Sequence, residues 1–160
     1  MKKLGMIGVL SAVLTLTACT ASQVETIAQL IGIAVNAMPG VVSLLTSNPQ
    51  AVSAAKTAQS DYQLAQTLIS GYRANAASAM TVAQHISALL ADANANLNAI
   101  VSAVPTSDRN RQKLAAVASV LIGVGQDIIA DLPSTHATVA HVKLPKPDVV
   151  RGQINQILSE

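Results

Sequence analysis

The feature that most constrains the fold is a run of apolar residues that recurs at alternating steps of three and four between Tyr62 and Val104. This spacing places the whole run on one stripe of an α-helix and is typical of a helix that packs along another helix. The run comprises Tyr62, Ala65, Ile69, Tyr72, Ala76, Ala79, Ala83, Ile86, Leu90, Ala93, Leu97, Ile100 and Val104, and Ala51, Ala55 and Ala58 extend it backwards. Because many of these residues are alanine and the chain has no Phe or Trp, we expect closely packed helices and an all-α fold.

The same run predicts one long helix over about 49–104. Asn48 can cap this helix, and Pro49 suits its first position, which has no intrahelical N–H bond to lose. An unbroken helix of this length would be roughly 80 Å long. Gly71 could instead mark a turn, and the pieces would then close into a four-helix bundle. The stripe passes Gly71 without a change of phase, so the sequence favours continuity.

A shorter helix is predicted on the amino-terminal side of the long one. Ser22-Gln23-Val24-Glu25 has the form of a capping box, so we expect this helix to begin at Ser22. Pro39-Gly40 falls inside the predicted helix, and because proline lacks the backbone N–H donor we expect a kink or a break at Met38. The apolar positions of this helix are Val24, Ile27, Ile31, Ala34, Met38, Val41 and Leu45.

A further helix is predicted after Pro105, capped within 106–108 and ending near Leu132-Pro133. Short turns join both flanking helices to the long helix, so both must fold back antiparallel along it, one on each half. This arrangement leaves apolar surface that self-association would cover, unless Gly71 breaks the rod. The apolar stripe of this helix consists of Leu114, Val117, Leu121, Val124 and Ile128.

The amino terminus has the order of a secretory signal. Lys2 and Lys3 precede an apolar stretch over 4–16, which is too short for the roughly 20 helical residues that span a bilayer. Leu16-Thr17-Ala18-Cys19 then resembles the lipobox of bacterial lipoproteins. The resemblance covers only the first 20 or so residues. It implies that 1–18 are removed and that Cys19 becomes the lipid-bearing first residue of the mature protein.

In lipoproteins of this kind the cysteine carries a diacylglyceryl group and is also N-acylated, and two or three acyl chains hold a protein firmly to a membrane. Thr20 stands where an aspartate would indicate inner-membrane retention. In an organism with two membranes, the resemblance therefore implies the periplasmic face of the outer membrane. The alternative is an ordinary signal peptide with a cysteine near its end, although Cys19 is the only cysteine of the chain.

The mature chain divides into a helical bundle domain over 19–132, an extended linker over 133–147 and a short helix over 148–160. Thr138, Val139 and Val142 alternate in the linker, which ends in two prolines. Val150, Ile154 and Ile157 give the last helix one apolar face, so we expect it to dock on the bundle.

The charge of the mature chain is near zero. The full sequence has 10 Lys and Arg residues against 8 Asp and Glu, but Lys2 and Lys3 belong to the signal, which leaves eight of each sign. With no basic stripe and only Tyr62 and Tyr72 as aromatic residues, nothing predicts nucleic-acid binding.

Signals for catalysis, metals or cofactors are weak. Gly123-Val124-Gly125 lacks the third glycine of a dinucleotide fingerprint, and we interpret the pair as a place where another helix approaches closely or where the helix is weakened. Asp127 and Asp131 lie four apart on one helix, where solvated carboxylates are the default. His85, His136 and His141 show no metal-ligand spacing, although the last two could meet across a loop. We expect no enzyme and no cofactor.

The segment over 27–46 has no charged residue and is long enough to cross a bilayer. Gln29, Asn36, Ser43 and the amphipathic period favour a place in the bundle core instead, and 114–130 is a weaker candidate span because it contains Asp127. The leading hypothesis is a non-enzymatic, lipid-anchored envelope protein that acts as a structural or interaction module, with itself or an envelope protein as partner. The alternatives are a membrane-active protein that inserts its uncharged helices and a carrier of apolar ligands.

Overall fold

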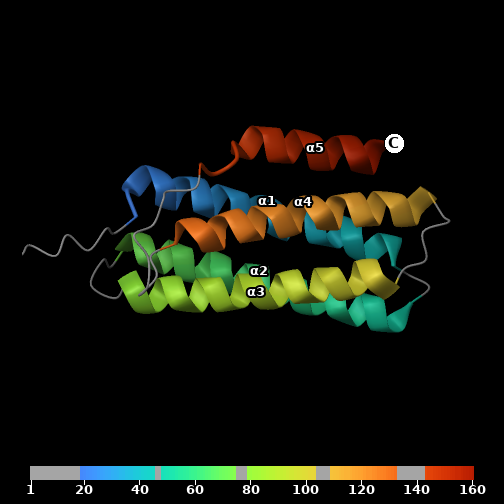
Figure 1. The fold of residues 1–160 in the computed structure, drawn as a ribbon, viewed down its shortest axis with the longest axis horizontal. Helices are drawn as coiled ribbons and strands as arrows, with labels where there is room; N and C mark the ends of the chain where they lie inside the picture. Colours follow the sequence, from blue (N-terminus) through green and yellow to red (C-terminus); the bar gives the residue numbers. More distant parts are fainter. Residues whose placement is uncertain (1–18, 46–47, 75–78, 104–108, 133–142) are drawn as a thin grey trace, which may run out of the picture.

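The computed structural model describes residues 19–45, 48–74, 79–103, 109–132 and 143–160, and these residues form helices and no strand. Four helices of similar length run alternately up and down beside one another, as the ribbon in Figure 1 shows. They are α1 (Ala21–Leu44), α2 (Pro49–Ala74), α3 (Ala79–Ala103) and α4 (Arg109–Asp131), and the shorter α5 (Pro147–Ser159) lies on the outside of α1 and α4. The all-α bundle predicted from the sequence is confirmed.

The expected long rod over 49–104 is wrong. Helix α2 ends at Ala74, α3 begins at Ala79, and the two helices pack against each other along their lengths. The chain changes direction between the end of α2 and the start of α3 and not at Gly71, which is an exposed residue inside α2. A hairpin lets α2 and α3 bury their alanine stripes on each other, whereas a single rod would need separate partners for each half.

The core consists of the apolar stripes that the sequence predicts, as far as these fall on described residues. Every predicted position of α1 and α4 is buried, and in α2 and α3 the stripe is buried at Ala51, Ala55, Ala58, Tyr62, Ala65, Ile69, Tyr72, Ala83, Ile86, Leu90, Ala93, Leu97 and Ile100. The remaining members, Ala76, Ala79 and Val104, have side chains outside the described part. Alanines at the helix contacts leave little between the backbones, which favours close approach of neighbouring helices.

Helix α1 begins and continues differently from the prediction. Its capping box is formed by Thr20 and Gln23, two residues before the predicted pair Ser22 and Glu25. The helix also runs through Pro39 without a break at Met38. The proline ring lies on an exposed position, while the next residue, Gly40, leaves room for Leu158 of α5, so packing after the proline holds the last turn of α1 in place.

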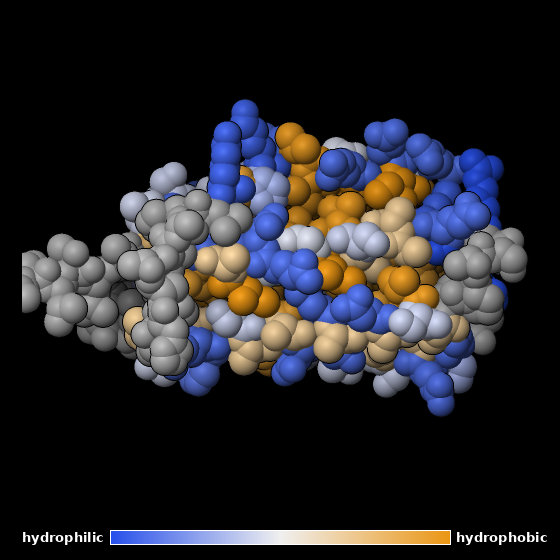
Figure 2. All heavy atoms as spheres, in the orientation of Figure 1, coloured by the Kyte–Doolittle hydropathy of each residue, from blue (hydrophilic) through white to orange (hydrophobic). Residues whose placement is uncertain are grey.

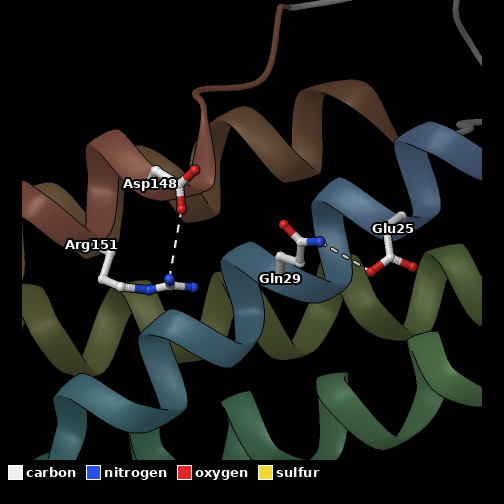
Figure 3. Close-up of polar contacts among 4 residues, drawn as sticks. All are labelled: Glu25, Gln29, Asp148 and Arg151. Atoms are coloured by element: carbon white, nitrogen blue, oxygen red, sulfur yellow. Dashed lines mark hydrogen bonds and ion pairs between the residues drawn. The ribbon is translucent and has the colours of Figure 1, made fainter.

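Two apolar stripes and one polar stripe run along α1. The predicted stripe faces the bundle core, and a second stripe formed by Leu30, Ile33, Ala37 and Gly40 reaches the region that α5 covers. The outward positions are mostly polar: Ser22, Glu25, Gln29, Asn36 and Ser43 are exposed. Gln29 Nε2 donates to Glu25 Oε1 at 3.1 Å on this outer surface (Figure 3). The two buried faces therefore account for the high apolar content of α1.

Helix α5 docks on the bundle, as its pattern predicts. Val150 and Ile154 are each 3% exposed, and Ile157 is half-buried. Hydrophobic residues line the junction of α5 with the bundle, and polar residues flank them (Figure 2). Helix α5 also carries an exposed ion pair of 3.6 Å between Arg151 and Asp148 (Figure 3). Of the predicted linker, 133–142 lie outside the described residues, and 143–146 are not helical.

Candidate lipid-attachment site

Cys19 lies at the end of the bundle where α1 begins. Thr20 is already the N-cap of α1: the Thr20 N–H donates to Gln23 Oε1 at 2.8 Å, and the Gln23 N–H donates to Thr20 Oγ1 at 3.2 Å. The cysteine is half-buried and packs against the hydrophobic core. No spacer therefore separates the cysteine from the folded domain, in contrast to a chain tethered through a flexible segment.

The last turns of α2 and α4 complete this corner. Tyr72 belongs to the core stripe of α2 and is 7% exposed, and its hydroxyl lies beside Cys19. Asp131, the last residue of α4, is 4% exposed, and Gln23 Nε2 reaches its Oδ2 at 3.4 Å. Gln23 thus caps its own helix with one side-chain atom and ties α1 to α4 with another.

Burial and the neighbouring groups shift the pKa of the cysteine. Burial raises the pKa of the Cys19 thiol, the Tyr72 hydroxyl lowers it, and the negative charge of Asp131 raises it again. Burial and the neighbouring Cys19 likewise raise the pKa of Tyr72. The free thiol in this corner is thus held in its neutral form, so the folded protein does not activate it as a nucleophile.

A half-open cleft of about 230 Å³ lies beside the corner. Its walls come from the first turns of α1, the end of α4 and the segment before α5: Ser22, Gln23, Thr26, Asp131, Lys143 and Leu144. The sequence predicts that Tyr72 lies in the core and Asp131 on the surface, and its patterns link neither residue to Cys19. Helix lengths carry that signal, because antiparallel helices of 24 and 26 residues bring the start of α1 beside the end of α2.

The other candidate residues are scattered. His85 is exposed on α3, while His136 and His141 lie outside the described residues. Asp127 and Asp131 differ in environment, because Asp127 is partly exposed and Asp131 is buried. Within the described ranges, no group of three His, Cys, Asp or Glu side chains could hold a metal ion.

Of the two glycines in α4, only Gly125 allows another helix to pack closely. A Cβ atom on Gly125 would lie 2.6 Å from Asn94 Oδ1, so the missing side chain lets α3 place the buried Asn94 against α4. No atom lies within 4 Å of the corresponding position on Gly123. The expected close approach is confirmed for Gly125 and does not hold for Gly123.

Comparison with protein-family models, curated proteins and solved structures found no match to this chain. Two described helices, α1 and α4, are long and apolar enough to cross a membrane when judged by length and composition alone.

Proposed function

We propose that this chain is a lipid-anchored envelope protein whose helical bundle is held at the membrane surface through Cys19. The observation that carries the proposal is the lipobox sequence Leu16-Thr17-Ala18-Cys19 ending one residue before the N-cap of α1. The sulfur forms a thioether bond to the glyceryl carbon of a phospholipid donor, the thiol proton is lost, and the headgroup leaves with the electrons of the broken carbon–oxygen bond. In an organism with two membranes the protein faces the periplasm from the outer membrane.

The proposed role is structural or interactive and involves no catalysis, cofactor or nucleic acid. A neutral mature chain offers no strong electrostatic attraction to nucleic acid. The exposed face of the bundle carries short polar side chains such as Gln29, Asn36 and Ser43. Such a surface suits contact with another envelope protein or with a second copy of the chain.

Metabolic labelling with a radioactive fatty acid tests the anchor. We expect the full-length wild type to be labelled and to fractionate with membranes, and Cys19→Ser to lose both properties. Ser22→Ala serves as the matched control, because Ser22 is exposed beside the cysteine and lies outside the lipobox. Export of an unlabelled wild-type protein would refute the proposal.

The membrane-active alternative is favoured by the two apolar helices alone. Packing accounts for the composition of α1, because this helix buries one stripe in the core and a second stripe in the region under α5. The outward stripe of α1 is polar, whereas a helix surrounded by lipid would be apolar on all faces. Membrane association of Cys19→Ser that only detergent reverses would support this alternative over the anchor.

The carrier alternative has a small cleft in its favour. About 200 Å³ lies between α1 and α5, lined by Ile33, Asn36, Ala37, Arg151, Ile154, Asn155 and Leu158. Sites for drug-sized ligands are roughly 300–1,000 Å³, so this half-open cleft suits a smaller molecule at most. Lipid that copurifies with the Cys19→Ser protein would support the carrier.

A further inference from the structure

The cleft of about 200 Å³ between α1 and α5 has an apolar floor. Three of the residues that line it are buried, namely Ile33 and Ala37 of α1 and Ile154 of α5. Leu158 of α5 also lines the cleft and is half-buried. Because the cleft is smaller than the roughly 300–1,000 Å³ of sites for drug-sized ligands, it suits a group of about the size of one aliphatic amino-acid residue.

The rim of this cleft carries one positive charge and two carboxamides. Asn36 of α1 and Arg151 and Asn155 of α5 are exposed, and the Arg151 side chain extends from α5 toward α1 (Figure 3). None of the described residues that line the cleft is acidic. Asp148 pairs with Arg151 at 3.6 Å, but its side chain is 93% exposed and does not line the cleft. Because a guanidinium group has five N–H donors, Arg151 can keep this partner and still bind a carboxylate.

These groups together match the carboxyl end of a polypeptide whose last residue is aliphatic. A single positive charge suits a monocarboxylate better than a phosphate group, which carries nearly two negative charges. A carboxamide both donates and accepts, so one asparagine can accept from the N–H of the last peptide bond while the other donates to the carboxylate. The half-open shape leaves the rest of the chain a path into solvent, whereas a site for a free small molecule encloses most of its ligand.

We propose that this cleft binds the carboxyl-terminal residue of a partner protein, with Arg151 on the terminal carboxylate and an aliphatic side chain on the floor between α1 and α5. Capture of a terminal carboxylate is a recurring mode of peptide recognition. The inference rests on the proposed interaction role and gives that role a site and a partner chemistry. It does not depend on Cys19, so the anchor and the peptide site can fail separately.

Calorimetric titration of the full chain carrying Cys19→Ser tests the site without the lipid. The probe is a short acetylated peptide of glycine and serine that ends in leucine with a free carboxylate, and the matched peptide ends in leucine amide. We expect the amide to bind about tenfold more weakly or worse, because a charge-assisted hydrogen-bond pair is lost. Adding Arg151→Gln to the protein should weaken binding of the free acid by a similar factor.

Lys146→Gln is the matched control for the loss of charge. Lys146 is the N-cap residue of α5, is exposed, makes no capping hydrogen bond with its side chain and does not line the cleft. We expect this variant to bind the free acid as tightly as the protein without it. Circular dichroism checks that Arg151→Gln keeps its helices, so that a loss of binding reports on the cleft.

Nuclear magnetic resonance locates the bound peptide. We expect the free acid to shift the amide signals of Ile33, Ala37 and Ile154, and we expect isocaproate, which has the carboxylate and the carbon skeleton of leucine but no peptide N–H, to bind several-fold more weakly. Equal affinities for acid and amide, or signal changes confined to other helices, would overturn the site. Isocaproate that binds as tightly as the peptide would overturn the chain end in favour of a free small acid. Fatty-acid labelling of the wild type reports on the anchor independently of all these results.

Discussion

At the scale of single residues, the contact between Asn94 and Gly125 constrains how α3 and α4 fit together. Asn94 is one of the two buried polar or charged residues described in the structure and is 6% exposed. Its amide oxygen has no hydrogen-bond partner among the described residues, so the contact works through shape more than through hydrogen bonding. The glycine removes a side chain that the amide would otherwise meet.

We therefore expect Gly125→Ala to destabilise the protein by about 1–3 kcal/mol, the usual range for overpacking a core. Gly123→Ala is the matched control in the same helix, because its new methyl group meets no atom within 4 Å. This control should be more stable than the wild type by up to about 1 kcal/mol, since alanine has the higher helix propensity. Urea unfolding followed by circular dichroism measures both. Equal stability of the two variants would contradict the packing role of Gly125.

Asp61 and Asp92 form a like-charge pair between α2 and α3. Burial and the negative charge of Asp92 raise the pKa of Asp61 above its ordinary value. The folded state therefore binds a proton more tightly than the unfolded state, and stability is lost as the pH rises from about 4 through the raised pKa. We expect Asp61→Asn to raise the Tm at pH 7 by no more than about 3 °C, since screened pairs of this kind contribute under about 1 kcal/mol.

The pH dependence provides the check on Asp61. At pH 3 both proteins carry a neutral side chain at position 61, so their Tm values should agree. Asp148→Asn is the control, because that carboxylate lies on α5 and pairs with Arg151. A Tm difference between Asp61→Asn and wild type that is the same at pH 3 and pH 7 would rule out the charge explanation.

At the scale of helices, one type of substitution has different effects on the second apolar stripe and on the polar stripe of α1. Ile33 is 6% exposed on the second stripe, so Ile33→Lys should cost about 3 kcal/mol or more, because an unpaired charge is buried and an apolar side chain is lost. Ser43→Lys should change the stability by less than about 0.5 kcal/mol, because Ser43 is exposed near the carboxyl end of α1, where a positive charge is favourable. Guanidinium unfolding distinguishes them, and a similar loss in both variants would mean that the outward face of α1 is also covered.

The sequence predicts the helices of this fold better than their connections. The three-four spacing identifies the buried residues because it depends only on helix geometry. The spacing cannot distinguish a rod from a hairpin. A short connection can have a length that fits the same steps of three and four residues, so the apolar pattern continues across it, as it does between Tyr72 and Ala83. The helix start at Thr20 was missed because Ser22-Gln23-Val24-Glu25 and Thr20-Ala21-Ser22-Gln23 both have the spacing of a capping box.

The candidate site was predicted in part for a related reason. Cys19 is recognisable from adjacent residues alone, whereas the positions of Tyr72 and Asp131 depend on which helix ends meet. The second stripe of α1 was not predicted. The apolar face of α5 indicates that this helix packs on the bundle, but it does not indicate which helices α5 contacts. Tertiary contacts, and not local patterns, decide both features.

At the scale of the whole molecule, the proposed anchor at Cys19 would determine which end of the bundle meets the membrane, because the connection between Cys19 and α1 is short. The starts of α1 and α3 lie at the same end as the cysteine, and the ends of both helices lie at the opposite end (Figure 1). Because Thr20 already belongs to the cap of α1, no spacer allows the bundle to move away from the surface. The protein is then expected to present its opposite end, where α1 and α3 end and α2 and α4 begin, away from the lipid.

Fluorescence quenching tests this orientation. Because the chain has a single native cysteine, a dye can be attached at one engineered position only. Once Cys19 is acylated, an engineered cysteine is the only free thiol in the protein. Thr81 and Ser102 are both exposed on α3, at opposite ends and roughly 30 Å apart along the helix. In vesicles with a headgroup quencher, we expect a dye on Thr81→Cys to be strongly quenched and a dye on Ser102→Cys to be nearly unaffected. Equal quenching at both positions would mean that the bundle lies along the membrane, and the absence of a spacer at Cys19 would then not determine its orientation.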